Sequence, residues 1–146
     1  MPEQETIKRA EEDAREGKSP STQAGEFVRE EIHHVREGKH GARSPQQAIA
    51  IGLSKARRAG VKLPPPKGSA SLRRKAAQDE KASEHKRRKP SRRRSRATEN
   101  ALKHESGRAA SKTALSRQAK SASAKRGKSA RSKAALKAAR TRRARS

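Results

Sequence analysis

The stretch SPQQAIAIGLSKARRAG, residues 44–60, carries the clearest folding signals in the chain. Its opening Ser-Pro pair favours a helix start, because serine caps free backbone N–H groups and proline suits the first helical position. Gln47 completes the S-x-x-Q pattern of a capping box. Gly60 suits the helix end, since glycine adopts the left-handed conformation without strain. The stretch therefore predicts a helix over residues 45–59.

The apolar residues of this predicted helix fall on one face. At 100° per residue, that face holds Ile49, Gly52, Leu53 and Ala56, flanked by Ala48 and Ala59. Ile51 and the cations Lys55, Arg57 and Arg58 lie outside it. We expect the helix to bury its apolar face and to present the cations to solvent.

A second helix is predicted over residues 20–37, between another Ser-Pro start and Gly38. Its apolar residues are Ala24, Phe27, Val28, Ile32 and Val35, of which all but the phenylalanine form a stripe. The opposite face carries Glu26, Arg29, Glu30, His33 and Glu37. We expect that face to be solvated, with charge pairs three and four residues apart.

A third, marginal helix is predicted over residues 3–16, where Ile7 is the one large apolar residue. The proline run at 64–66 forbids helix after the 45–59 segment. Residues 1–63 would thus form a head with a small core. Its predicted members are Ile7, Phe27, Val28, Ile32, Val35, Ile49, Leu53, Val61 and Leu63. So few large side chains make a domain of this size marginal without a partner or self-association.

Charge is distributed very unevenly along the chain. Residues 1–63 hold 12 Lys and Arg against 10 Asp and Glu, whereas residues 64–146 hold 28 against 5. Low apolar content with high net charge is typical of disordered segments. The predicted fold class is a small all-α head of two to three short helices, a Pro-rich hinge at 64–68, and a long, mostly disordered polybasic tail at 69–146. Its Ala, Lys and Arg residues give the tail helix-forming potential once a polyanion neutralises it.

Composition also disfavours several classes of protein. The chain has no cysteine, which removes disulfides, thiolate metal sites and thiol nucleophiles. No apolar run has the length of a membrane span, and the charged N-terminus is unlike a secretory signal. No combination of acid, base and nucleophile supports an enzyme. We predict a cytoplasmic, nucleoid-associated protein with no catalytic residue, no cofactor and no metal site.

One histidine pair bears on that last prediction. His33 and His34 stand three residues after Glu30 and Glu31, a spacing that places metal-binding pairs on a helix. A single helix supplies too few ligands, and a dimer would be needed to complete a site. We therefore interpret these side chains as part of a solvated polar face.

The residues from Gly25 to Gly60 resemble a known family. SPQQAIAIGLSKARRAG, preceded by EFVREEIHHVREGKHGAR, is similar to the RS-x-QQAIAI-(A/G)-LS-x-AR core of small basic bacterial proteins of uncharacterised function. This resemblance implies a bacterial origin and a helical head, and it assigns no site. In composition, residues 67–146 resemble the C-terminal domain of linker histones and the Lys/Ala-rich tails of bacterial histone-like proteins, with more arginine and less proline.

The basic tail predicts binding to nucleic acid. Lys and Arg that neutralise phosphates release condensed counterions, which drives binding regardless of sequence. The tail has no aromatic residue on which unpaired bases would stack, so duplex DNA is favoured, with structured RNA as the alternative. The predicted contacts are Lys86, Arg87, Arg88, Lys89, Arg92, Arg93, Arg94, Arg96, Lys125, Arg126, Lys128, Arg131, Lys133, Lys137, Arg140, Arg142, Arg143 and Arg145. Lys55, Arg57 and Arg58 are predicted as secondary contacts.

The function expected from the sequence is therefore sequence-nonspecific, histone-like binding to nucleic acid without enzymatic activity. The head would position the protein, self-associate or recruit a partner. Two alternatives stay open. In one, the head docks a protein through its apolar face and Ile51, and the tail only localises the complex. In the other, the chain is a basic protein associated with RNA or the ribosome.

Overall fold

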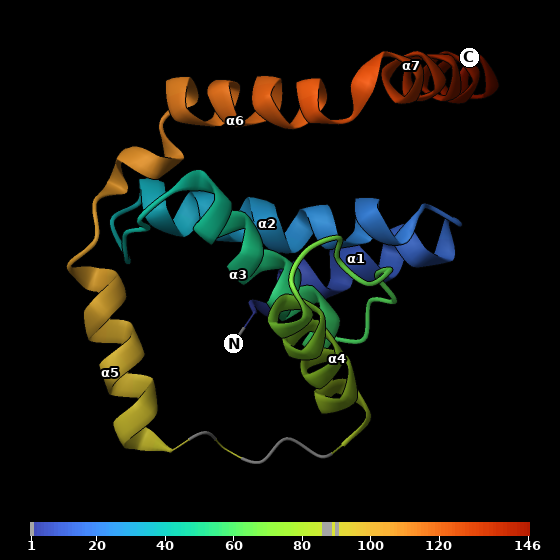
Figure 1. Ribbon diagram of the computed structural model, residues 1–146. Coiled ribbons are helices and arrows are strands. Elements are labelled where there is room, and N and C mark those ends of the chain that lie inside the picture. Colours follow the sequence, from blue (N-terminus) through green and yellow to red (C-terminus); the bar gives the residue numbers. More distant parts are fainter. Residues whose placement is uncertain (1, 86–88, 90) are drawn as a thin grey trace. The chain divides into compact units, whose positions relative to one another are not determined.

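The computed structural model describes residues 2–85, 89 and 91–146 (Figure 1). Within these residues the chain forms seven α-helices and one 3-10 turn, and no strand. The helices are α1 (Gln4–Arg15), α2 (Pro20–Arg36), α3 (Pro45–Arg58), α4 (Ala70–Glu84), α5 (Arg92–Lys103), α6 (Lys112–Lys125) and α7 (Gly127–Arg145), and the turn η1 (Gly107–Ala110) follows α5. They make two compact units, Met1–Ser111 (unit 1) and Lys112–Ser146 (unit 2).

Helices α1 to α3 follow their predicted ranges, and α2 and α3 begin and end at the predicted capping residues. The Ser44 hydroxyl accepts a hydrogen bond from the Gln47 backbone N–H at 3.2 Å, and the Gln47 side chain accepts one from the Arg43 N–H at 2.6 Å. The capping box is thus closed one residue earlier than the standard pattern, in which the cap's own N–H donates. Gly38 and Gly60, after α2 and α3, have φ of 76° and 100°. Each of the three helices lies within one residue of its predicted range.

The core of unit 1 lies where α2 contacts both α1 and α3. Phe27, which is 1% exposed, packs there with Ala10, Ala24, Ala56 and Val61. Of the other residues predicted for the core, Ile32 and Val35 are buried, while Ile7, Val28, Ile49, Leu53 and Leu63 are half-buried. The apolar face of α2 is therefore largely as predicted.

A close approach of backbones joins α2 and α3. A Cβ atom on Gly52 would lie 2.6 Å from the Val28 Cα, a separation that atoms do not tolerate. Ala48 and Ala56, one turn to either side, are fully buried. The small residues of the QQAIAIGLSKA segment thus bring the two helices into contact, which explains why its larger apolar side chains stay at the edge of the core.

The prediction of a solvated polar face on α2 is wrong for two residues. Glu30 is 5% exposed and Glu31 is 1% exposed, because their partners come from other elements. Glu30 Oε1 accepts from the Glu3 N–H at 2.7 Å, and Glu31 is ion-paired with Lys55 of α3. Helical spacing from Ala24 and Val28 places Glu31 within the apolar stripe, so the carboxylate is buried with it.

The prediction of a long disordered tail is also wrong, because α4 to α7 occupy most of it. The helices of the tail form because its segments are rich in residues of high helix propensity and are separated by capping residues, although the average charge is high. Ser69 begins α4 by accepting a hydrogen bond from the Leu72 N–H at 3.3 Å. Asp79, which is 3% exposed, accepts from Ser54 and Arg58 of α3 at 2.7 and 2.8 Å. These bonds join α4 to α3 across the 64–68 loop, so the chain divides after Ser111 and not at that loop.

The segment after α5 also packs on the head. The backbone N–H groups of Gly41 and Ala42 donate to the carbonyls of Leu102 and Ser106 at 2.8 and 3.1 Å. The Arg36 guanidinium donates to the Ala110 carbonyl at 2.9 Å. Residues 102–110 therefore fix the loop between α2 and α3.

Unit 2 has a different character. Residues 112–146 are all described, and none of those in α6 or α7 is buried. Their helices rest on the high propensity of Ala, Lys and Arg rather than on a core. No described helix of the chain combines the length and the apolar character needed to cross a bilayer.

Candidate nucleic-acid interface

The predicted tail contacts fall on three described segments. Lys89 precedes α5, whose first half carries Arg92, Arg93, Arg94 and Arg96. Lys125 ends α6, and Arg126 precedes α7, which carries Lys128, Arg131, Lys133, Lys137, Arg140, Arg142, Arg143 and Arg145. The remaining predicted contacts, Lys86, Arg87 and Arg88, lie outside the described residues.

Helix α7 is charged on all sides. Its eight Lys and Arg side chains are all exposed. At 3.6 residues per turn, their positions are distributed around the whole circumference, so the helix has no apolar stripe. Unit 2 as a whole holds thirteen Lys and Arg and no Asp or Glu. No acidic side chain of unit 2 is present to neutralise these cations.

The start of α5 is electrostatically unfavourable as it stands. Arg92, Arg93 and Arg94 occupy its first turn, although the positive end of the helix dipole disfavours cations there. The Ser91 side chain makes no capping hydrogen bond. An anion near this turn would be attracted both by the guanidinium groups and by the free N–H groups.

The three secondary contacts predicted on α3 have partners inside unit 1. Lys55 is ion-paired with the buried Glu31. Arg57 donates to the Pro64 carbonyl at 3.2 Å, and Arg58 donates to Asp79 at 2.8 Å. These cations hold α3 to its neighbours, so they are poor candidates for contacts with nucleic acid.

Asp79 is the electrostatic centre of the α3–α4 contact. Burial alone would raise the pKa of its carboxyl. Hydrogen bonds from Lys75, Ser54 and Arg58 outweigh burial, so the pKa lies below its ordinary value. The carboxylate is therefore anionic at neutral pH and stabilises the docking of α4.

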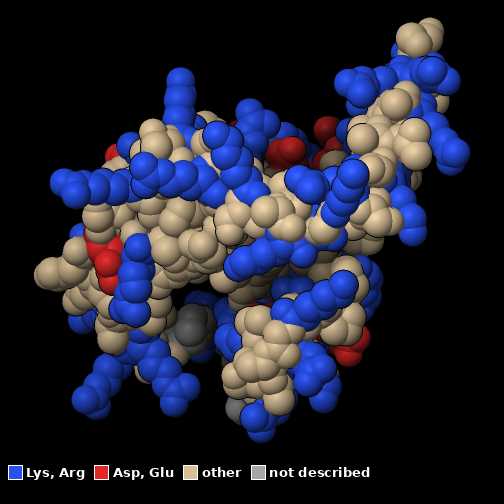
Figure 2. Space-filling model, turned by 45° about the horizontal axis from the view of Figure 1, so that its top comes forward, with Lys and Arg blue, Asp and Glu red and all other residues tan. Residues whose placement is uncertain are grey.

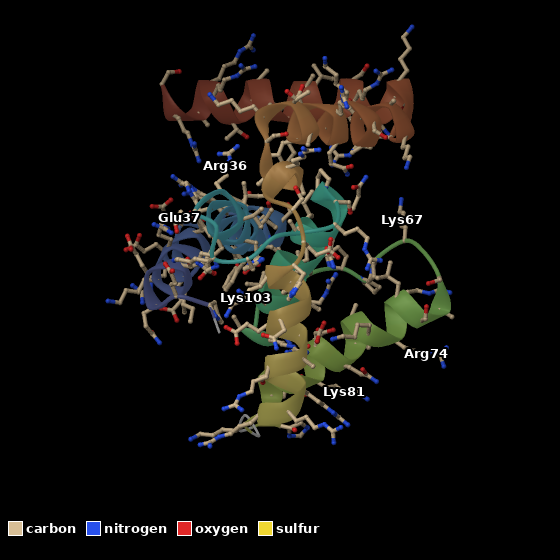
Figure 3. The ribbon with its side chains drawn as sticks, turned by 90° about the vertical axis from the view of Figure 1, so that its left-hand side faces the viewer. Arg36, Glu37, Lys67, Arg74, Lys81 and Lys103 are labelled. Carbon is tan, nitrogen blue, oxygen red and sulfur yellow. The ribbon has the colours of Figure 1, made fainter. Side chains whose placement is uncertain are left out.

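Exposed cations outside the predicted set are also numerous. Figure 2 shows Lys and Arg side chains over much of the face in view, with Asp and Glu visible at fewer places. Lys67, Arg74 and Lys81, on α4 and the loop before it, are exposed examples (Figure 3). Because of these cations, a test of nucleic-acid binding by α7 must distinguish the effect of removing cations from α7 from the effect of lowering the total charge of the chain.

The sequence-based interpretation missed a buried ionic cluster around Glu31. His40 Nε2 lies 3.2 Å from Glu31 Oε2, and His34 Nδ1 lies 3.8 Å from Glu31 Oε1. His40 comes from the loop after α2, and no sequence pattern indicated that it would reach this carboxylate. The signal that was available is the place of Glu31 within the apolar stripe of α2.

No curated protein and no solved structure is significantly similar to the chain. Residues 15–67 match the model of a family described as "Family of unknown function (DUF6496)". This match runs from the end of α1 through α3 and contains the Gly25–Gly60 segment. It supports the resemblance to an uncharacterised family that was expected from the sequence, and residues 68–146 lie outside it.

Proposed function

We propose that the protein binds nucleic acid without sequence specificity and without enzymatic activity, with duplex DNA as the preferred form. The observation that carries the proposal is unit 2, whose thirteen cations face no acidic residue of their own unit and whose helices bury no side chain. Each phosphate that these cations neutralise releases condensed counterions, and this release supplies the free energy of nonspecific binding.

The geometry of α7 favours a duplex over a protein surface. A helix that docks on a protein needs an apolar stripe, and α7 has cations on every side instead. The major groove of duplex DNA admits an α-helix and flanks it with two phosphate backbones. Cations on opposite sides of one helix can then contact both backbones. The arginine-rich first turn of α5 offers a second contact.

Unit 1 would serve as the positioning or self-association part of this histone-like protein. Its core is small, and on α3 Lys55 and Arg58 are paired with the buried carboxylates of Glu31 and Asp79. A cytoplasmic protein with such a basic arm would associate with the nucleoid, where duplex DNA is the most abundant polyanion. Structured RNA offers the same phosphate contacts, and competition between the two nucleic acids decides between them.

The test compares two variants of the full chain that each lose the same eight charges. In the first, the eight Lys and Arg of α7 become Gln. In the matched control, eight exposed cations of unit 1 become Gln, namely Lys8, Arg15, Arg29, Lys67, Arg73, Arg74, Lys81 and Arg108. Binding to a random-sequence duplex is measured by fluorescence anisotropy between about 50 and 200 mM salt, the range over which phosphate contacts weaken strongly.

We expect the α7 variant to bind far more weakly than the control. The slope of log K against log salt should become shallower by roughly 0.9 for each phosphate that the variant no longer neutralises. An equal decrease in both variants would show that total charge, rather than α7, determines binding. Little binding by the unmodified chain would contradict the proposal itself and direct attention to the head. If structured RNA displaced the duplex in competition, RNA rather than duplex DNA would be the preferred ligand.

A further inference from the structure

Three side chains able to bind a metal ion meet at the C-terminal end of α2. Glu31 and His34 come from α2, and His40 comes from the loop that follows it. The carboxylate is fully buried, and both imidazoles are mostly buried. One ligand atom from each residue lies within 4.8 Å of the other two.

The outer nitrogen of each imidazole already has a hydrogen-bond partner. His40 Nδ1 lies 2.9 Å from the Gly41 carbonyl oxygen, which only accepts, so this nitrogen carries the proton. His34 Nε2 lies 3.1 Å from the carboxylate of Glu3. A carbonyl or carboxylate on the remote nitrogen is the arrangement that orients metal-binding histidines.

The inner nitrogens face the two oxygens of a single carboxylate. In the tautomer that carries its proton on the outer nitrogen, His40 would present a lone pair at Nε2, 3.2 Å from Glu31 Oε2. Two lone pairs at this distance repel each other unless a cation lies between them. Ligand atoms bound at 2.0–2.1 Å in a tetrahedral zinc site stand about 3.3 Å apart. The observed separation therefore suits a shared metal ion.

The surroundings favour an added positive charge. Lys55 pairs with Glu31 Oε1, and Oε2 faces His40. Glu30 Oε1 lies 3.9 Å from His34, and Glu30 Oε2 is buried without a hydrogen-bond partner among the described residues. With Glu3, the cluster holds three carboxylates against two lysines, the half-buried Lys55 and the exposed Lys39, whose Nζ lies 3.5 Å from Glu3 Oε1. A divalent cation would offset this local excess of negative charge.

The loop that carries one of the ligands is held in place by contacts with residues 102–106. The loop that carries His40 is fixed by hydrogen bonds to Leu102 and Ser106. A Cβ atom on Gly41 would clash with the Glu105 carbonyl oxygen, so only glycine permits this approach. His34 also lines an open hollow of about 240 Å³, whose lining includes neither Glu31 nor His40.

We propose that Glu31, His34 and His40 form a site for one divalent transition-metal ion, zinc being the favoured occupant. The ligands would be one carboxylate oxygen of Glu31, His34 Nδ1 and His40 Nε2. Two imidazoles and one carboxylate form a donor set typical of zinc, and cobalt(II) substitutes for zinc in such sites as a spectroscopic probe. The site does not depend on the nucleic-acid interface, which lies on other helices.

The test uses the full chain without an affinity tag, freed of metal with a chelator. Cobalt(II) is added while visible absorption is recorded, and zinc is then used to displace it. Thermal unfolding is followed by circular dichroism with and without zinc. Three proteins are compared: the unmodified chain, His40→Ala, and the control His33→Ala, which removes the exposed histidine adjacent to His34.

We expect one cobalt ion per chain, with the strong visible bands of tetrahedral coordination, and displacement by zinc. His33→Ala should behave as the unmodified chain. His40→Ala should bind more than about 100-fold more weakly, a larger effect than removal of an outer-shell partner causes. Zinc should raise the unfolding temperature of the unmodified chain and of His33→Ala but not of His40→Ala, since only an ion bound to the folded state stabilises it.

Two results would overturn the proposal. One is the absence of stoichiometric cobalt or zinc binding by the unmodified chain, which would mean that a second proton on His40 separates the two lone pairs. The other is unchanged affinity in His40→Ala, which would place any bound ion on Glu3, Glu30 and His34 instead. Because His40 lies in a loop, helix content measured before titration shows whether the variant is folded; if it is not, His34→Gln replaces it.

Discussion

Units 1 and 2 are both rich in cations, but only unit 1 has acidic side chains to pair with them. Residues 1–111 contain all 15 Asp and Glu of the chain, and two of these, Glu31 and Asp79, are buried among Lys and Arg from neighbouring helices. Residues 112–146 contain none. The difference shows that a very basic chain can still fold compactly where a few acidic residues lie at helix contacts.

The presence of acidic partners in unit 1 and their absence from unit 2 also indicates a different role for the cations of each unit. In unit 1, the cations on α3 stabilise helix packing, and their charge is used internally. In unit 2, no side chain of α6 or α7 is buried and no acidic side chain compensates the charge, so the cations are available to phosphates. Substitutions should therefore affect the stability of unit 1 and the binding activity of unit 2.

The largest effect on stability should come from the core. Phe27→Ala removes a fully buried side chain and should lower the free energy of unfolding by about 3–5 kcal/mol. The matched change on α7, Leu136→Ala, removes a side chain that is 63% exposed and should alter stability by less than about 0.5 kcal/mol. Urea unfolding followed by circular dichroism measures both. A large effect of Leu136→Ala would mean that α7 is packed and that the two units do not differ in this way.

The next largest effect should come from the contact between α2 and α3. Gly52→Ala places a Cβ atom against the Val28 backbone and should destabilise unit 1 by about 1–3 kcal/mol. Gly25→Ala, within α2, meets no atom within 4 Å and should stabilise by up to about 1 kcal/mol. Thermal unfolding of both variants tests this pair. Destabilisation by both would mean that helix packing is not what distinguishes the two sites.

A comparable effect, dependent on pH, is expected at Asp79. Its pKa is lower in the folded state, so its contribution to stability is full above the ordinary carboxyl pKa, about 3.9, and is lost as the pH falls further. Asp79→Asn should cost about 1–3 kcal/mol at neutral pH, and the difference from the unmodified chain should shrink under acid. Urea titrations from pH 7 to 3 measure it. A difference that is constant with pH would contradict the anionic role of Asp79.

The smallest effect should come from helix capping. Ser44→Ala removes the acceptor for the Gln47 N–H and should cost about 1 kcal/mol. Ser132→Ala on α7 removes only a hydroxyl bonded to the Lys128 carbonyl and should change little. If the two substitutions lowered the unfolding temperature equally, side-chain hydrogen bonds would contribute equally to stability in the two units, contrary to this prediction.

Local sequence signals located the helices of the head, and composition misled about the tail. Ser-Pro starts and glycine ends are short-range features, so α2 and α3 could be placed from the sequence. The average charge of the tail gives no indication of what two of its residues do. Ser69 caps the start of α4, and Asp79 accepts a hydrogen bond that joins α4 to α3. A pairwise contact between distant segments, such as Asp79 with Arg58, has no signature in composition.

The candidate sites show the same division. The cations of α7 could be proposed as contacts from the sequence alone, because such contacts need only be numerous and exposed; that role stays a prediction. The cluster around Glu31 was missed because His40 reaches it through a loop whose position depends on residues 102–106. The clue available in advance was a glutamate among the apolar positions of α2, which indicates a buried charge that needs a partner.

The central claim is that nucleic acid engages unit 2 and leaves the α3 cations in their internal pairs. Hydrogen exchange of the full chain, read by mass spectrometry with and without a random duplex, tests it directly. The amides of α7 in the unbound chain should exchange rapidly because few packing contacts protect them, and binding should slow their exchange while α2 and α3 stay unchanged. Protection that appears in α2 and α3 but not in α7 would contradict the account.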